Sequence, residues 1–208
     1  MKSLNTLFAT LLLTGAGAGT AIAASSVDLT VRGLITPSSC EPSLPSGGNV
    51  DIGKISAKDL KADQATQLSA HNVPFTVTCD AATLMALEAK DNREGSDYNN
   101  DISQFGLGLI NGNEKLGSME LRLLNPLADG VASRIIGSRD GGLTWGNDRY
   151  LARDNILSVA DGSTDIPIPV QLFNAELNIL PIIAPTNSLT LTEEVPIDGS
   201  VTLTVKYL

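Results

Sequence analysis

The sequence has few of the residues on which most catalytic and metal sites depend. His71 is the only histidine among 208 residues, and Cys40 and Cys79 are the only cysteines. A structural metal site needs several such ligands at short spacing. A Ser-His-Asp triad would have to use His71, which no Gly-x-Ser-x-Gly elbow accompanies. Because glycine motifs for phosphates and dinucleotides are also missing, we expect no enzyme activity, no cofactor and no bound metal.

Positive charge is scarce as well. The chain carries 14 Lys and Arg residues against 23 Asp and Glu residues, which gives a formal net charge of −9. Bulk electrostatics cannot hold such a chain on nucleic acid or on an anionic membrane. We therefore expect neither of these partners.

Long apolar runs are limited to the beginning of the chain. Met1–Ala23 is typical of a secretory signal peptide, with Lys2 as its one charge, an apolar run from Leu7 to Leu13 and small residues at Ala21-Ile22-Ala23. The run is shorter than the roughly 20 residues that a membrane span requires. We predict cleavage after Ala23, export without membrane insertion, and a single domain over residues 24–208.

The remaining composition predicts an all-β fold. Hydrophobic residues make up 42% of the chain, and 19 Gly and 10 Pro divide them into short runs without helical periodicity. Many short strands separated by turn residues are typical of a β-sandwich or a barrel.

Two cysteines in an exported chain usually form a disulfide, and we predict one between Cys40 and Cys79. Cys79 ends an alternating run from Val73 whose apolar side chains share one strand face. Cys40 follows another alternating run, Val27–Thr36, which breaks at Pro37. The bridge would therefore join the first strand to the second long strand.

The last nine residues, Ser200–Leu208, alternate strictly between apolar and polar side chains. Val201, Leu203, Val205 and Tyr207 lie on one face of the predicted strand. A strand with such a face must pair with another strand or aggregate. It is either the final strand of an ordinary sandwich or a strand to which another protein adds its own by β-augmentation.

Four segments resemble the subunits of chaperone-usher fimbriae. Val31–Cys40 is similar to their first strand, which reads apolar-x-Gly-x-apolar before a turn and a cysteine. Val50–Ile55 resembles their next short strand, and Val73–Cys79 the strand that carries the second cysteine. The terminal strand with its penultimate Tyr207 looks like the segment that a periplasmic chaperone recognises. Within that superfamily the chain looks most like an uncharacterised family of fimbrial-like exported proteins.

The resemblance implies an immunoglobulin-like, pilin-type β-sandwich that lacks its last strand until a partner supplies one. The implied partners are a periplasmic chaperone, an usher and other fimbrial subunits, and the four apolar residues of the terminal strand would pair with the chaperone. Subunits that polymerise also carry an N-terminal donor strand. In Ala24–Thr30 only Val27 and Leu29 have the right alternation, and both serve equally well as the beginning of the first strand.

A second motif lies at residues 138–145. Ser138, Asp140, Gly142, Thr144 and Trp145 match the five defined positions of the Asp box, Ser-x-Asp-x-Gly-x-Thr-Trp. In this motif the Asp caps backbone N–H groups of a tight turn, the Gly takes a conformation that other residues resist, and the Trp packs beneath. Sialidases carry one Asp box per propeller blade, and one copy cannot build a propeller. We expect a structural role, with glycan contact through Trp145 or Tyr150 as the alternative.

The middle of the chain leaves more choices open. Asp91–Asp101 is acidic and could bind calcium, but it lacks the ligand spacing of a known loop, so we expect a solvated surface loop. Ala81–Lys90 fits a strand or a helical turn, and its context favours a strand. Asn111-Gly112 predicts a hairpin turn between two alternating runs.

Three further predictions concern the last third of the chain. Ile166–Leu172 contains Pro167 and Pro169 and is predicted to be an edge strand, or a strand whose two prolines face away from a partner, because proline cannot donate to a ladder. Leu189–Thr192 is predicted to be a short strand, and Asp198-Gly199 a turn before the terminal strand.

Two functions fit these observations. The first is a fimbrial-like structural or adhesion subunit that passes through the periplasm to the cell surface. The second is a self-completed, secreted carbohydrate-binding module that binds a host or surface glycan and never polymerises.

Overall fold

The structure of the chain is a computed structural model that describes residues 29–33 and 39–208. Residues 29–33 belong to one compact unit and residues 39–208 to another. The predicted signal peptide, Met1–Ala23, and the possible donor residue Val27 lie outside the described residues. In residues 29–33 there is no strand, and the side chains of Leu29 and Val31 are exposed.

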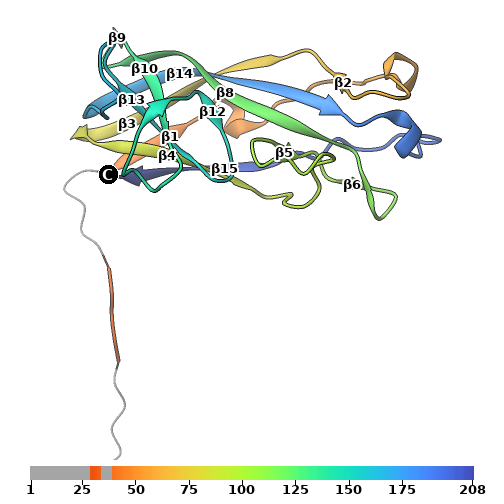
Figure 1. Cartoon of the computed structure of the whole chain (residues 1–208), viewed down its shortest axis with the longest axis horizontal. Helices are drawn as coiled ribbons and strands as arrows, with labels where there is room; N and C mark the ends of the chain where they lie inside the picture. Colours follow the sequence, from red (N-terminus) through yellow and green to blue (C-terminus); the bar gives the residue numbers. More distant parts are fainter. Residues whose placement is uncertain (1–28, 34–38) are drawn as a thin grey trace, which may run out of the picture. The chain divides into compact units, whose positions relative to one another are not determined.

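Strands dominate the larger unit (Figure 1). The strands are β1 (Cys40–Ser43), β2 (Thr66–Gln67), β3 (His71–Thr83), β4 (Met85–Asp91), β5 (Phe105–Gly106), β6 (Leu109–Ile110), β7 (Glu114–Lys115), β8 (Gly117–Ala128), β9 (Val131–Ala132), β10 (Arg134–Ser138), β11 (Gly146–Asn147), β12 (Tyr150–Leu151), β13 (Ile156–Ala160), β14 (Val170–Ile183) and β15 (Val201–Tyr207). Three short 3-10 turns accompany them: η1 (Pro45–Gly48), η2 (Ala57–Asp59) and η3 (Thr186–Ser188). The all-β prediction is confirmed.

The strands form a sandwich of two main sheets. The eight-stranded sheet has the order β1-β3-β14-β8-β12, with β2, β5 and β9 attached beside this path. The five-stranded sheet has the order β11-β10-β13-β4-β15, and a small hairpin joins β6 to β7. All of these pairings are antiparallel. Long strands β8 and β14 pair over most of their length and form the frame of the larger sheet.

One hydrophobic core lies between the two sheets. Phe75 and Phe173 of the larger sheet are almost fully buried and meet edge to face, with ring centroids 6.4 Å apart. Leu87 and Leu157 of the smaller sheet belong to the same cluster. Alternation along each strand supplies these inward side chains, as the sequence predicted.

The prolines around β14 have positions that differ from the prediction. The predicted edge strand Ile166–Leu172 is wrong, because β14 begins only at Val170 and is central in its sheet, between β3 and β8. Pro167 forms an isolated bridge to Ala160 instead. Pro181 lies inside β14 at the position between its pairing with β3 and its pairing with β2, where only its carbonyl is needed and accepts the N–H of Leu68.

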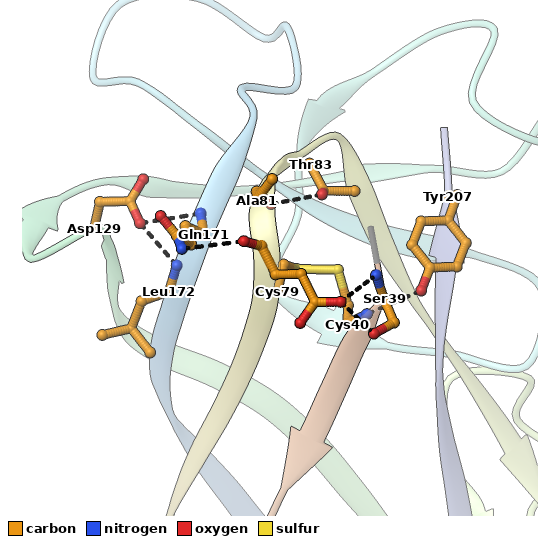
Figure 2. The surroundings of a disulfide bond; sticks show 10 residues. Ser39, Cys40, Cys79, Ala81, Thr83, Asp129, Gln171, Leu172 and Tyr207 are labelled. Atoms are coloured by element: carbon orange, nitrogen blue, oxygen red, sulfur yellow. Dashed lines mark hydrogen bonds between the residues drawn. A yellow bond between two sulfur atoms is a disulfide. The ribbon is translucent and has the colours of Figure 1, made fainter. Parts of the chain in front are cut away.

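Cys40 and Cys79 form the predicted disulfide, which joins opposite residues of β1 and β3 (Figure 2). Cys79 is buried in the core. The predicted first strand is nevertheless wrong for residues 29–33, and β1 begins at Cys40 itself. Ser39 is fixed to β3, because the Asp80 carboxylate accepts its backbone N–H at 3.1 Å and its hydroxyl at 2.7 Å.

Two other predicted strands do not form. Val50–Ile55 and Leu189–Thr192 are irregular in the structure. Both have apolar alternation, but no strand among the described residues lies beside them to complete a ladder. Ala81–Lys90 does form strand, divided between β3 and β4 at Leu84. Asn111 and Gly112 have positive φ values of 51° and 93° and make the predicted turn, between β6 and β7.

Removing the disulfide should destabilise the sandwich. A Cys40→Ala/Cys79→Ala variant is expected to lose about 4 kcal/mol of unfolding free energy, because the bridge closes a loop with a sequence separation of 39 residues. Urea unfolding of the variant and of the oxidised wild type measures this difference. A loss below about 1 kcal/mol would mean that β1 is held by its other contacts alone.

Candidate functional site: the groove beside the terminal strand

Strand β15 lies at an edge of the five-stranded sheet. All seven of its residues pair in register with β4, from Val201 opposite Asp91 to Tyr207 opposite Met85. Among the described residues no strand pairs with its other side. It is far longer than β11, the two-residue strand at the opposite edge of the same sheet. A long edge strand of this kind is a template for pairing with another chain.

The direction of its backbone groups follows from the ladder. The carbonyl of Ser200 accepts the N–H of Asn92, and the N–H of Leu208 donates to the carbonyl of Leu84. In an antiparallel pair, residues with both groups turned toward the partner alternate with residues whose groups point away. The backbone N–H and C=O groups of Val201, Leu203 and Val205 therefore point to the free edge.

An apolar groove adjoins the first half of β15. It has a volume of about 440 Å³ and reaches the core between the two sheets. The larger sheet lines it with Val73, Met119, Leu121, Leu177, Ile179 and Pro181, and the smaller sheet with Val201 and Leu203. Val201, Leu203 and Val205 are only half-buried, although they pack against the core. The edge of the sandwich is thus incompletely covered where β15 begins.

Tyr207 closes the opposite end of this edge. Its hydroxyl accepts the backbone N–H of Cys40 at 3.0 Å, so the last residue of β15 is tied to the first residue of β1 (Figure 2). Tyr207 as a whole remains 44% exposed. Beyond Ser43 strand β1 ends, and the irregular residues that follow it, from Leu44 to Ile52, line the groove without pairing with β15.

The two segments that fail to form strands border this opening. Val50 and Ile52 line the groove, and they also line a second hollow of about 540 Å³ together with Leu191, Val195 and Ile197. Within residues 50–55 the backbone makes one local hydrogen bond, from Gly53 N–H to the Asp51 carboxylate. The sequence analysis did not predict that residues 50–55 would line the groove. The feature that could have indicated it is their apolar alternation, which in the structure has no partner strand among the described residues.

The Asp box forms a compact turn after β10. Asp140 Oδ1 accepts the backbone N–H groups of Leu143 and Thr144 at 3.0 and 2.9 Å, and its Oδ2 accepts the Thr144 hydroxyl. Ser138 Oγ accepts the N–H of Gly142 at 2.8 Å. The bonds that Asp140 accepts from Thr144, from the Ser138 hydroxyl and from Leu143, led by those from Thr144, hold the pKa of Asp140 far below its ordinary value.

Trp145 lies against the same turn. Its indole N–H donates to the carbonyl of Gly142 at 3.1 Å, and Gly142 has a φ of +96°. A Cβ at Gly142 would lie 3.4 Å from the Trp145 ring and 3.7 Å from Leu208. The indole N–H and one side of the indole ring are therefore both in contact with the turn itself. The turn lies beside the five-stranded sheet that contains β15.

The acidic segment Asp91–Asp101 is less solvated than predicted. Asp91 and Asp97 are buried, at 4% and 1% exposure. Asp91 accepts the N–H groups of Arg93 and Gly106, while Asp97 accepts the N–H of Asp101 and pairs with Arg153 at 3.3 Å. The expected surface loop is wrong for these two residues, because their carboxylates organise the loop from inside.

Over residues 29–33 and 39–208, no cluster of His, Cys, Asp and Glu side chains could hold a metal ion. The same part of the chain contains no helix long and apolar enough to cross a membrane.

Comparison with known proteins gives uncharacterised relatives. Residues 29–105 match a family described as "Protein of unknown function (DUF1120)". The match includes both cysteines and strands β1, β3 and β4, which form the disulfide and part of the groove surroundings. It does not reach β15.

Two proteins of Escherichia coli (strain K12) are also similar. "Protein GltF" is 31% identical over 125 residues, covering 49% of this chain and 49% of the relative. "Uncharacterized protein YhcF" is 29% identical over 117 residues, covering 46% of this chain and 49% of the relative. The matched part thus spans about half the length of these relatives.

Replacing the capping carboxylate should weaken the Asp-box turn. Asp140→Ala is expected to lower the melting temperature by roughly 2 to 4 °C, because the N–H groups of Leu143 and Thr144 lose their acceptor. Differential scanning calorimetry measures the shift. Leu143→Ala is the matched control, since this exposed side chain lies in the same turn and should leave the melting temperature unchanged.

A second turn should make stability depend on acid pH. Asp161 Oδ1 accepts the N–H and hydroxyl groups of Ser163 and Thr164, which lowers the pKa of Asp161 from 3.8 to about 2. A lowered pKa means that the stabilisation is present above pH 3.8 and is lost as the pH falls toward 2. Asp161→Asn cannot titrate, so its melting temperature should approach that of the wild type between pH 4 and 2. A constant difference over that range would contradict this account.

Proposed function

We propose that the chain is an exported, fimbrial-like subunit whose groove accepts an extended strand from another protein. The first donor is a periplasmic chaperone, and other subunits replace it when an usher assembles them at the cell surface. The proposal rests above all on one observation: within residues 29–33 and 39–208 no strand pairs with the outer edge of β15, and this edge lies beside an apolar groove that reaches the core.

The chemistry of the groove favours a strand as its occupant. The backbone groups of Val201, Leu203 and Val205 point to the free edge and can bond to any added strand. Alternate side chains of that strand would enter the groove and bury its apolar walls. Main-chain bonds then supply a general affinity, and the buried side chains supply specificity.

The same proposal interprets the sandwich as pilin-type and immunoglobulin-like, with the groove in place of a missing strand. The short first strand β1 carries one cysteine of the bridge, and Tyr207 of the terminal strand bonds to that cysteine's backbone. Disulfides persist in oxidising compartments, so the Cys40–Cys79 bridge supports export. The exposed Leu29 is available as part of a donor strand for a neighbouring subunit.

Co-expression with a fimbrial chaperone tests the proposal. Wild-type protein should be obtained as a 1:1 complex with the chaperone, and without it should aggregate or be degraded, because the groove stays uncovered. Leu203→Ser should weaken the complex by about tenfold, since a leucine in the groove loses its burial against the added strand. Size-exclusion chromatography with light scattering and a titration of the purified partners measure both effects.

Thr204→Ser is the matched control, because this neighbouring side chain is exposed on the other face of β15. It should bind the chaperone like the wild type. A monodisperse, cooperatively melting monomer obtained without any chaperone would contradict the proposal and would mean that the groove needs no donor.

A further inference from the structure

A row of polar side chains crosses the outer face of the eight-stranded sheet, away from the groove. Tyr150 of β12 pairs with Arg122 of β8, Arg122 with Asn178 of β14, and Asn178 with Asn72 of β3. The neighbours Leu121, Leu123 and Leu177 are buried in the core, so alternation turns the row to the opposite face. Asn72 is exposed, and the other three side chains are half-buried.

Two guanidinium groups lie against one aromatic ring at the end of this row. The Arg122 guanidinium carbon is 4.7 Å from the centroid of the Tyr150 ring, and that of Arg149 is 6.0 Å from it. Both distances are in the range of cation–π contacts. The ring therefore holds two cations close together at the β12 edge of the sheet.

Carboxylates on the same face compensate this charge. Glu120 bonds to Nε and Nη2 of Arg122. Arg149 is exposed and forms no ion pair with any residue in the described part of the chain. The guanidinium of Arg149 is thus an unpaired cation on a face that also carries Glu120 and, beside Asn178, Glu176.

The same face presents hydrogen-bond donors that are not used within the described residues. They are the Tyr150 hydroxyl, Nη1 of Arg122, the guanidinium of Arg149 and the amide nitrogen of Asn72, whose oxygen already accepts Asn178 Nδ2 at 2.6 Å. A ligand that matches them must carry acceptors and negative charge. Guanidinium groups bind carboxylates in a planar, bidentate geometry.

We infer that this Tyr150–Arg122–Arg149 cluster and the adjoining asparagines bind an acidic polysaccharide. A sugar carboxylate would lie on Arg149 and Nη1 of Arg122, and ring hydroxyls would accept from Tyr150 and Asn72. Neighbouring strands are about 4.8 Å apart, close to the length of one sugar residue, so successive sugars can follow the row across the sheet. Single-stranded nucleic acid fits less well, because it binds by stacking its bases on aromatic rings, and the Tyr150 ring already lies against two guanidinium groups.

The site is separate from both the groove and the Asp box. Trp145, the other aromatic residue considered for glycan contact, uses its indole N–H within its own turn. Binding at the Tyr150 cluster does not require strand addition at β15, and such binding would give a surface subunit its adhesive property.

Isothermal titration with galacturonic acid oligomers tests the inference, with neutral dextran oligomers of equal length as the comparison. The acidic oligomers should bind, and binding should weaken as the salt concentration rises, since the contact is electrostatic. Arg149→Ala should lower the affinity by about tenfold, because an exposed charge-assisted bond is lost without disturbing the fold. Tyr150→Phe should lower it less, since only the hydroxyl is removed.

Arg139→Ala is the matched control. Arg139 is also an exposed arginine, but it pairs with Asp154 and, at 4.0 Å, with Asp148, and its loss should leave the affinity unchanged. Equal binding of dextran, equal loss with Arg139→Ala, or an affinity that Arg149→Ala does not alter would each overturn the inference. So would tighter binding of single-stranded DNA than of the acidic oligomers.

Discussion

The structure depends on a ladder that is satisfied on one side only. Strand β15 bonds to β4 along its whole length, while no strand in the described part of the chain receives the outward backbone groups of Val201, Leu203 and Val205. In a closed sandwich a neighbouring strand would bond to these groups and would also cover the core. Here the outward backbone groups of β15 and the uncovered part of the core lie at the same edge of the sandwich, and the groove is found there.

The rest of the fold keeps that edge open rather than collapsed. The long pairing of β8 with β14 holds one wall of the groove, and the disulfide fixes β1 on β3. Tyr207 then ties the end of β15 to Cys40 and so links the two sheets there. Between these fixed points the irregular residues 50–55 border the opening without pairing with β15.

The sequence pattern predicted those features that depend on residues close to one another in the chain. The terminal strand, the disulfide and the all-β class followed from alternation, from cysteine number and from turn residues. The Asp-box turn likewise uses residues within one short segment. The failures have a different cause. Val50–Ile55 alternates like a strand, and whether it becomes one depends on a partner strand far away in the chain, which no local pattern can reveal. The row from Tyr150 to Asn72 was equally hidden, because four strands bring it together.

Hydrogen exchange at the amides of β15 tests the central claim most directly. In the isolated chain, the N–H groups of Val201, Leu203 and Val205 should exchange rapidly, while those of Thr202 and Thr204, which bond to β4, should be protected. In the complex with a strand-donating chaperone, all five amides should be protected. Slow exchange of Leu203 and Val205 in the isolated chain would contradict the account, since it would mean that the edge of β15 is already paired.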